Sequence, residues 1–529
     1  MQNLTRRTFL KLAGASSTAV ALAACAPPSG TPASNEGAAG APAAAPITIT
    51  MVESWFGIPQ YKESIDPVTQ EISKQMQSEG LNIEIISMIL EDHNNKYPAL
   101  YASGADFTMA FDAPWYKMNS LRDQGALAPL EDLVDQYGAD LKVAITDKIY
   151  NANFMNGHLY GVPAAYYYGG TGGVIFREDL RAKYDAPMPT SEGGWPSLEP
   201  YLQALVDNEP DLVPFVNVAT QSMVSYNRNR KAWAPGVSKT GVTALDGTAD
   251  WTLMDEEDNP ALLETAELLR SWWEKGYVNK TDLPFSGTSQ NSQVDYIYPG
   301  RGGACVENEP DFKWVQQTKE MQSSKADAAL MGVDMIGERA GVTKGMGNLK
   351  QWNFVVFNVN APAEQHQAGI QYFNWLAGSQ DNLDLWLMGI DGVNYKKEDG
   401  MKFSEIEGVD QARNYRRMWY VSGMSGRYQR QPADLPPEAE EALKFFTTEE
   451  NWVFNPYEAF EADTKALEVD SAKLNAVYDE AVHGLMTGQE TVADSVAKMK
   501  QMLDDAGRQS YKEQLQAQID AYIAANKKA

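Results

Sequence analysis

Histidine and cysteine are scarce in this sequence, and their scarcity argues against several kinds of site. The chain has only 4 histidines and 2 cysteines in 529 residues. The histidines show no metal-binding spacing; they are His93, His158, His366 and His483. No Gly-x-Ser-x-Gly nucleophile motif is present, and the glycine-rich run at 169–173 lacks the Lys-Ser/Thr end of a phosphate loop. We therefore expect no zinc, serine-nucleophile or phosphate-loop chemistry.

Positive charge is also in short supply. The 44 lysines and arginines are outnumbered by 71 aspartates and glutamates, so the formal net charge is −27. Such a balance argues against nucleic-acid binding, which needs a cationic surface. Beyond the N-terminal segment, no run is apolar enough to cross a membrane. Hydrophobic residues at 43% and charged residues at 22% are ordinary for a globular protein, and the length allows more than one domain.

The first residues have the features of an export signal. Arg6-Arg7 followed by Phe9-Leu10 resembles the twin-arginine export pattern, and the apolar stretch 12–24 is too short for a comfortable membrane span. The stretch ends in Leu22-Ala23-Ala24-Cys25, which resembles the lipobox of bacterial lipoproteins. In a lipobox the cysteine is acylated and becomes the new N-terminus. We predict a twin-arginine lipoprotein signal peptide at 1–25 with lipidated Cys25, and an extracytoplasmic protein anchored by lipid to the bacterial cell membrane.

Residues 26–46 are nearly all Ala, Pro, Gly, Ser and Thr. Such a segment has little apolar surface to bury, so we expect a flexible tether. If Cys25 is acylated, Cys305 has no partner within the chain and is expected to be a buried structural thiol. Aromatic residues are plentiful, with 13 Trp and 25 Tyr, and most of them are expected in the core. A surplus of these side chains is what a sugar-stacking cleft requires.

The first part of the domain alternates between strand and helix patterns. Alternating apolar residues predict strands at 47–52, 83–89 and 106–111. A helix is expected between the first two, with Asp66 as N-cap, Pro67 in the first turn and Gly80 beyond its end. This order favours a parallel sheet covered by helices, hence an α/β fold. The C-terminal part is predicted to be helical, and one helix begins with a capping box at Thr491 and Asp494.

Four stretches together resemble the sugar-binding branch of the extracellular solute-binding proteins of ABC importers. They are 104–108 with 125–133, 160–163 with 173–180, 302–306, and 364–378 with 389–395. The tail, with Asn455-Pro456-Tyr457-Glu458-Ala459-Phe460 and the helices to residue 524, resembles larger lipoproteins of this group that bind oligosaccharides. The resemblance runs through nearly all of the chain after residue 46.

The resemblance implies an α/β, two-lobe periplasmic-binding-protein-like fold of type II, with a hinge and an interlobe cleft. It assigns 47–163 plus 352–400 to lobe one and 164–351 plus 401–529 to lobe two. It also implies a carbohydrate ligand, delivery to ABC transporter membrane permease subunits, and closure of the lobes around the ligand. A monomer without catalytic activity is expected. No cofactor is expected, and the sequence leaves a structural Ca²⁺ open.

Ligands of α/β sheets bind at the carboxyl ends of strands. Candidate binding residues are therefore those just past predicted strands or beside a crossing between lobes. They are Trp55, Asp112, Trp115, Tyr166, Tyr167, Tyr168, Asn308, Glu309, Asp311 and Trp352. Trp and Tyr offer rigid faces to the C–H patches of a sugar, and carboxylates and amides bind its hydroxyls. In relatives the loop at Asp112 commonly supplies such a carboxylate. Adjacent tyrosines should alternate in direction, so one or more of the three should line the cleft.

Two other functions fit the residues. A peptide or other small solute could occupy the same fold, and a surface adhesion or sensor protein could use the fold without a transporter. A glycoside hydrolase would need two carboxylates at a fixed separation. Glu309 and Asp311 have the spacing of such a pair, but nothing else in the sequence marks them as acid and base.

Overall fold

The structure is a computed structural model. It describes residues 45–526 apart from 54–60, 91–92, 166–167, 169–171, 218–222, 224–238, 245–251, 281–291, 336–344, 412, 416–427, 455–458, 464–465, 468 and 470. The chain divides into two units, Met1–Ala45 and Pro46–Ala529, and the second is the subject here. Within the described part of the chain, no helix is long and apolar enough to cross a membrane.

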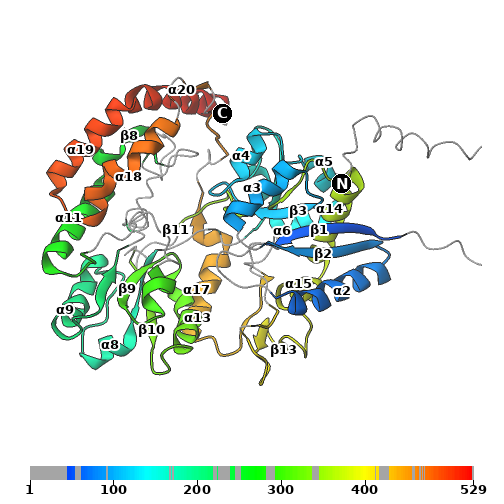
Figure 1. Ribbon diagram of the computed structural model, residues 1–529, viewed down its shortest axis with the longest axis horizontal. Helices are drawn as coiled ribbons and strands as arrows, with labels where there is room; N and C mark the ends of the chain where they lie inside the picture. The colour runs from blue at the N-terminus through cyan, green and yellow to red at the C-terminus, as the bar shows by residue number, and fades with distance from the viewer. Residues whose placement is uncertain are drawn as a thin grey trace, which may run out of the picture. The chain divides into compact units, whose positions relative to one another are not determined.

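Lobe one is built on a five-stranded sheet with the order β2-β1-β3-β12-β4 (Figure 1). Its strands are β1 (Ile47–Glu53), β2 (Ile83–Ile89), β3 (Met109–Asp112), β4 (Gly161–Pro163) and β12 (Phe354–Phe357). The first three strands are parallel, as their alternation with helices predicts, whereas β12 is antiparallel to both β3 and β4. Because β12 runs in the opposite direction, its start lies beside the ends of β3 and β4. Segments from three distant parts of the sequence therefore meet at one edge of the sheet.

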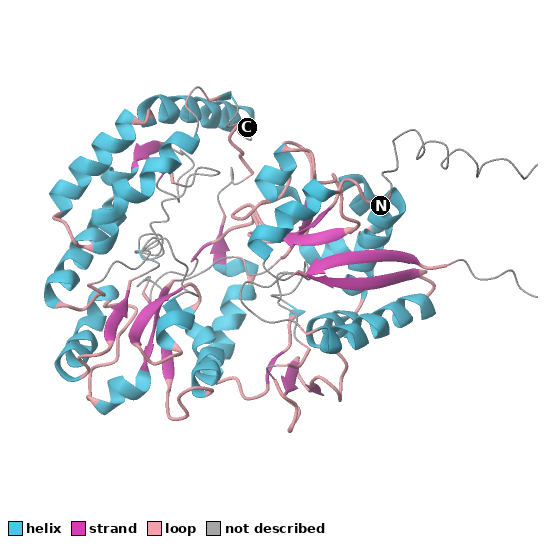
Figure 2. Ribbon diagram, in the orientation of Figure 1, coloured by secondary structure: helices cyan, strands magenta, loops and turns pink. Residues whose placement is uncertain are grey.

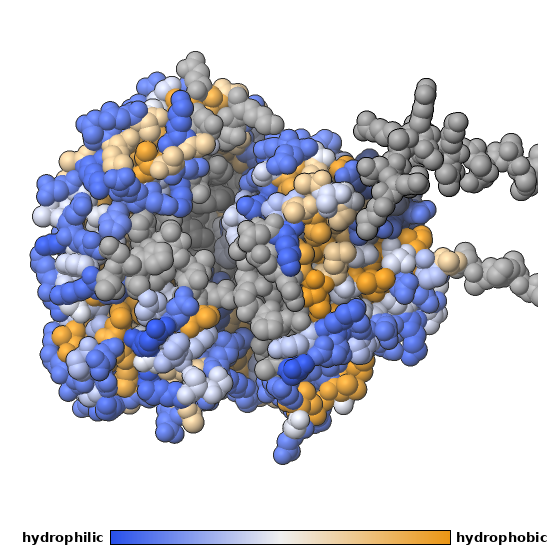
Figure 3. Space-filling view, viewed as in Figure 1, coloured by the Kyte–Doolittle hydropathy of each residue, from blue (hydrophilic) through white to orange (hydrophobic). Residues whose placement is uncertain are grey.

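Helices cover both faces of this sheet because its strands alternate their apolar side chains. Ile49 and Met51 of β1 face one core, whereas Val52 faces the other. The first core is closed by α2 (Lys62–Ser78), α5 (Glu131–Tyr137), α6 (Ala139–Ile145), α7 (Asp147–Ala152), α14 (Ala363–Gly378) and α15 (Gln380–Met388). The second core is closed by α3 (His93–Ser103) and α4 (Met118–Asp123). On the face shown in Figure 3, hydrophobic residues also gather on the surface over this lobe.

The predicted start of α2 was wrong. The helix begins at Lys62 with Tyr61 as N-cap, and Pro67 lies inside it. A proline inside a helix removes the hydrogen bond to the carbonyl four residues earlier, here that of Glu63. Both Pro67 and Glu63 are exposed, so this carbonyl lies on the solvent side of the helix, where water can replace the lost donor.

Lobe two is built on a four-stranded sheet with the order β10-β5-β9-β6. Its strands are β5 (Gly173–Arg177), β6 (Val213–Val216), β9 (Gly302–Glu307) and β10 (Leu330–Asp334). Only the β6–β9 pair is parallel, and β5 is antiparallel to both of its neighbours. The helices of this lobe include α8 (Glu178–Lys183), α9 (Glu199–Asn208), α11 (Pro260–Lys275) and α13 (Pro310–Gln322), with short helices η1 (Trp195–Leu198) and η3 (Gln293–Ile297).

The C-terminal helices form a separate apolar core against α11. They are α18 (Ser471–Thr487), α19 (Val492–Asp505) and α20 (Arg508–Asn526), shown at the upper left of Figure 2, and they pack with the hairpin β7 (Val242–Ala244) and β8 (Leu253–Asp255). The predicted N-cap is confirmed: the Thr491 hydroxyl accepts a hydrogen bond from the Asp494 N–H at 3.2 Å. The Asp494 carboxylate accepts from the Thr491 hydroxyl at 2.6 Å, whereas in a capping box it would accept from the Thr491 N–H.

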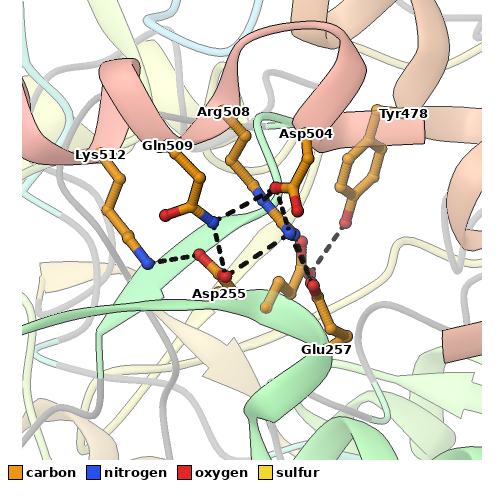
Figure 4. Close-up of polar contacts among 8 residues, drawn as sticks. Asp255, Glu257, Tyr478, Asp504, Arg508, Gln509 and Lys512 are labelled. Atoms are coloured by element: carbon orange, nitrogen blue, oxygen red, sulfur yellow. Dashed lines mark hydrogen bonds and ion pairs between the residues drawn. The ribbon is translucent and has the colours of Figure 1, made fainter. Parts of the chain in front are cut away.

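A buried ionic cluster fastens α19 and α20 to β8 and to the short helix η2 (Glu256–Asp258) (Figure 4). Arg508 is 0% exposed and donates to both Glu257 oxygens, one of them at 2.6 Å, and to Asp504 at 2.8 Å. Asp255 accepts from Lys512 at 2.6 Å. Because Glu257 is also buried, the charges of Arg508 and Glu257 depend on each other rather than on water.

Segments near two of the predicted lobe crossings are hydrogen-bonded to one another and to α17 (Pro437–Thr447). The Tyr168 N–H donates to the Phe446 carbonyl at 3.3 Å, and the Tyr168 carbonyl accepts from Asn348 at 2.6 Å. Phe446 belongs to α17, which is followed by η5 (Glu449–Asn451). Nearby, β11 (Gly345–Met346) pairs in parallel with β16 (Trp452–Val453). A further small sheet joins β13 (Lys396–Glu398), β14 (Lys402–Ser404) and β15 (Gln431–Pro432). The predicted lobe boundaries stay a prediction.

Candidate ligand-binding site

One edge of the lobe-one sheet collects several of the predicted binding residues. In the sheet register, Phe354 at the start of β12 lies opposite both Asp112 at the end of β3 and Pro163 at the end of β4. The residues that follow β3 and β4 therefore meet those that precede β12. The Ala164 N–H confirms this proximity, since it donates to the Asn353 carbonyl at 2.9 Å.

Asp112 is buried and organises the loop that follows it. One carboxylate oxygen accepts from the N–H groups of Ala113 at 2.7 Å and Lys117 at 3.0 Å, and the other accepts from the Tyr97 hydroxyl at 3.0 Å. Burial raises the pKa of Asp112 to about 6, although these donors act in the opposite direction. The carboxylate thus fixes the loop 113–117 and is 0% exposed.

Trp115 stands on that loop and is 58% exposed, an unusual state for so large an apolar side chain. Its indole N–H donates to the Asn353 side-chain oxygen at 3.1 Å. Its ring also packs against those of Phe111 and Tyr116, with centroid distances of 6.4 Å and 5.9 Å. Trp352, next to Asn353 in the chain, is 40% exposed. The structure thus brings Trp115 and the Trp352 position to one edge.

The structure describes only one of the three adjacent tyrosines, and that one does not face an open surface. Tyr166 and Tyr167, like Trp55 and Cys25, lie outside the described residues. Tyr168 is only 3% exposed, and its ring contacts Phe454 edge to face at 5.9 Å. Together with its backbone bonds to Asn348 and Phe446, this packing makes Tyr168 part of the core rather than of an open surface.

In lobe two, β9 ends in a carboxylate that the sequence did not single out. Glu307 is 2% exposed and accepts from the Asn308 N–H at 2.7 Å, from the Gln317 amide at 2.7 Å and from Gln293. Lys313 lies 3.3 Å from it. Burial alone would raise the pKa of Glu307, but Lys313 and the amide and N–H donors outweigh it, so this pKa is lowered.

The predicted residues Asn308, Glu309 and Asp311 surround the start of α13. Glu309 is 2% exposed and ion-paired with Lys313, and burial raises its pKa. Asn308 is half-buried, and its side-chain oxygen has no hydrogen-bond partner within the described part of the chain. Asp311 lies in the first turn of α13. This edge of lobe two therefore holds carboxylates and amides, with Lys313 beside them.

The sequence reasoning missed Asn353, Glu307 and Lys313. Asn353 could have been found as the polar neighbour of Trp352 at a crossing, and Glu307 as the charged end of the apolar run that begins at Gly302. Cys305, in the middle of that run, is a buried free thiol as expected, and burial raises its pKa well above the usual value. Among the residues that the structure describes, no group of three or more His, Cys, Asp or Glu side chains could hold a metal ion.

Comparison with solved structures confirms the predicted two-lobe fold class. The chain is similar to the N-glycan transport solute binding protein NgtS from Streptococcus pneumoniae, with 18% identity and a TM-score of 0.69 over 91% of this chain and 100% of that one. It is also similar to an HMO-binding, ABC-transporter-associated solute binding protein from Bifidobacterium longum infantis, with 13% identity and a TM-score of 0.58 over 90% and 99%.

Sequence comparisons agree with the predicted resemblance. A carbohydrate ABC transporter substrate-binding protein of Streptococcus pneumoniae is 27% identical over 235 residues, which are 44% of this chain and 46% of that relative. The match therefore spans about half the length of the curated relative. A family model described as a domain of unknown function, DUF3502, matches residues 456–524. The resemblance to sugar-type solute-binding proteins, inferred from the sequence motifs, is confirmed.

Proposed function

We propose that this protein is the extracytoplasmic substrate-binding lipoprotein of an ABC importer, and that it captures an oligosaccharide between its lobes without chemical change. The observation that carries the proposal is Trp115, an exposed aromatic face held by Asn353 and by the loop that Asp112 organises. A sugar ring can stack on such a face and bury apolar area without any ligand charge.

Lobe two would supply the hydrogen-bonding half of the cleft. Asn308 and Asp311 lie at one end of its sheet, beside the buried carboxylates of Glu307 and Glu309. Amide and carboxylate side chains bind hydroxyl groups. Because Asn308 and Asp311 are only partly buried, they are the members of this group that we propose for contact with a ligand.

Three solved structures of two similar proteins support a carbohydrate as the ligand. NgtS has been crystallised with Man1GlcNAc and with Man5GlcNAc, and its name assigns it to N-glycan transport. A further neighbour, AlgQ2, is an alginate-binding protein. By analogy we propose that the present chain acts as a monomer, is anchored at Cys25 to the cell membrane, and delivers its ligand to membrane permease subunits. The proposed binding of the oligosaccharide depends on neither the tether nor the membrane partner.

Isothermal titration calorimetry tests the ligand class. Man5GlcNAc, a maltooligosaccharide and a tripeptide would each be titrated into the protein, and heat of binding is expected with an oligosaccharide only. Binding of the tripeptide alone would contradict the proposal. After long incubation with the protein, product analysis should find the bound sugar intact. Cleavage of the sugar would show that the protein is a hydrolase instead.

Trp115→Ala locates the site. We expect it to weaken oligosaccharide binding about tenfold, since a stacked aromatic face contributes on the order of 1.4 kcal/mol. The variant should unfold at the wild-type temperature because Trp115 is 58% exposed. Val143→Ala, at a 77% exposed position of α6, is the control. Wild-type affinity in Trp115→Ala would remove this residue from the site.

A further inference from the structure

A short segment within the match to the domain of unknown function touches lobe one. This segment, residues 460–463, is called the strap here. One oxygen of Glu461 accepts a hydrogen bond from the Asn156 N–H at 2.9 Å, and the other lies 3.6 Å from the Arg122 guanidinium. Arg122 belongs to α4 of lobe one, and the two side chains of the pair are only 14% and 23% exposed. The contact is therefore partly shielded from water.

Asn156 is shaped to offer its N–H to this carboxylate. Met155 and His158 exchange two backbone hydrogen bonds, at 2.7 and 3.0 Å, and so close a two-residue turn. Asn156 and Gly157 in the turn have φ of 50° and 83°, the left-handed values of a tight hairpin turn. Neither N–H of such a turn is needed inside the hairpin, so that of Asn156 is available to Glu461.

The other side of the strap is fixed to the C-terminal helices. The Asp463 N–H donates to the Gln518 side chain at 2.8 Å, and the Gln518 amide donates back to the Asp463 carbonyl at 3.1 Å. Phe460 is 2% exposed and packs edge to face on Tyr522 at 5.4 Å. Gln518 and Tyr522 both belong to α20. The strap is thus part of the C-terminal core.

The C-terminal helices are themselves attached to lobe two. Arg270 of α11 donates to the Gly488 carbonyl at 3.1 Å, at the end of α18. The Asn217 amide, just past β6, donates to the Met486 carbonyl at 3.0 Å. Trp272 of α11 packs on Phe215 of β6 at 5.1 Å. A continuous set of contacts therefore runs from the lobe-two sheet through α11, α18 and α20 to the strap.

We propose that the strap is a latch between the lobes. Its Glu461 holds lobe one through Arg122 and the Asn156 N–H, whereas Asp463 and Phe460 hold the helices attached to lobe two. The Phe460 carbonyl also accepts a hydrogen bond from Lys350, near the predicted return crossing, at 2.9 Å. Lobe movement in a hinged protein requires contacts that can break, and a partly exposed carboxylate contact can break at modest cost. The DUF3502 region thereby acquires a mechanical role in setting lobe separation.

Distance measurement between spin labels tests the latch without any ligand. Labels would be placed at Val143→Cys in lobe one and Met188→Cys in lobe two, two exposed positions, in the full chain with Cys25→Ser. Cys305 is 0% exposed and stays unlabelled. In Glu461→Ala we expect the population at the wild-type distance to fall about fivefold relative to other distances, the factor that corresponds to about 1 kcal/mol.

Two further variants make the result decisive. Glu461→Gln keeps an acceptor for the Asn156 N–H and loses the charge that faces Arg122, so its distribution should lie between those of wild type and Glu461→Ala. This variant decides the question if Glu461→Ala does not fold. Glu178→Ala is the control because Glu178 is 22% exposed and pairs with Arg181 inside α8. Identical distributions in wild type and both Glu461 variants, or equal broadening in the control, would overturn the latch. Since no ligand is used, the outcome is independent of the proposed oligosaccharide.

Discussion

Arg508→Met should loosen the C-terminal helices more than any surface charge change. Arg508 is 0% exposed and holds Glu257, which is 2% exposed, through hydrogen bonds to both carboxylate oxygens. Methionine keeps much of the side-chain volume but leaves Glu257 buried without its cation. The loss of the cation costs less free energy at Asp504, because this side chain is 30% exposed and can be hydrated. Loss of one partner from a buried ion pair costs about 3–5 kcal/mol.

Hydrogen exchange in α20 measures this loss directly. The C-terminal helices have their own core, so they can open locally with a free energy of their own. A loss of 3–5 kcal/mol corresponds to a fall in amide protection of about two to three and a half orders of magnitude, at 1.4 kcal/mol per tenfold. Peptides from the lobe-one strands should keep their protection.

The double variant Glu257→Met/Arg508→Met separates charge from packing. If the uncompensated carboxylate causes the loss, removal of both charges should restore most of the protection. Lys498→Met is the control, because its pair with Glu480 spans 4.0 Å and is 37% and 72% exposed, and such pairs contribute about 0–1 kcal/mol. The reasoning is refuted if Arg508→Met protects α20 as well as the control does, or if the double variant is as unprotected as the single one.

Two further predictions concern pH. Burial raises the pKa of Glu256 to about 7, although a hydrogen bond from Tyr478 acts in the opposite direction. The folded state therefore binds this proton more tightly than the unfolded state does. The free energy of unfolding should consequently fall as pH rises from about 4.5 to about 7. Glu256→Gln should remove this decline in thermal unfolding scans, and an unchanged slope would contradict it. Asp112, with an ordinary pKa of 3.8 raised to about 6, should add a decline over that lower range. Asp112→Asn keeps an acceptor for the Lys117 N–H and should flatten it, as measured in the same scans.

Local patterns in the sequence predicted the regular elements of lobe one well. The alternation in 47–52 and 83–89 became β1 and β2, paired in register from Ile47↔Ile83 to Glu53↔Ile89. The N-cap at Thr491 also formed as predicted. These features depend on neighbours in sequence, so local rules suffice. The same local rules misplaced the start of α2, because Asp-Pro is a common helix start and nothing local shows that the carbonyl of Glu63 faces solvent.

The site could be predicted only in part, because its partners are distant in sequence. Trp115 depends on Asn353, 238 positions away, and no periodicity links them. Alternation among three adjacent tyrosines could not reveal that the backbone of Tyr168 would bond to Asn348 and Phe446. Candidate residues that follow strands were found because the end of a strand is a local signal. Their contacts depend on the antiparallel β12, which topology alone decides.

The carboxylate and aromatic side chains at the candidate site differ in exposure and in the contacts that they make. Carboxylates such as Asp112 and Glu307 are almost fully buried and use their oxygens on the N–H groups of their own loops. Trp115, in contrast, keeps its face exposed. A buried carboxylate satisfied by backbone donors is rigid, and a rigid loop presents an aromatic face without a large entropy loss on binding. For the oligosaccharide proposed above, affinity would depend on small gains per contact, so a preorganised loop would favour binding. Asp112 therefore serves the site by holding the loop of Trp115 in place rather than by facing solvent.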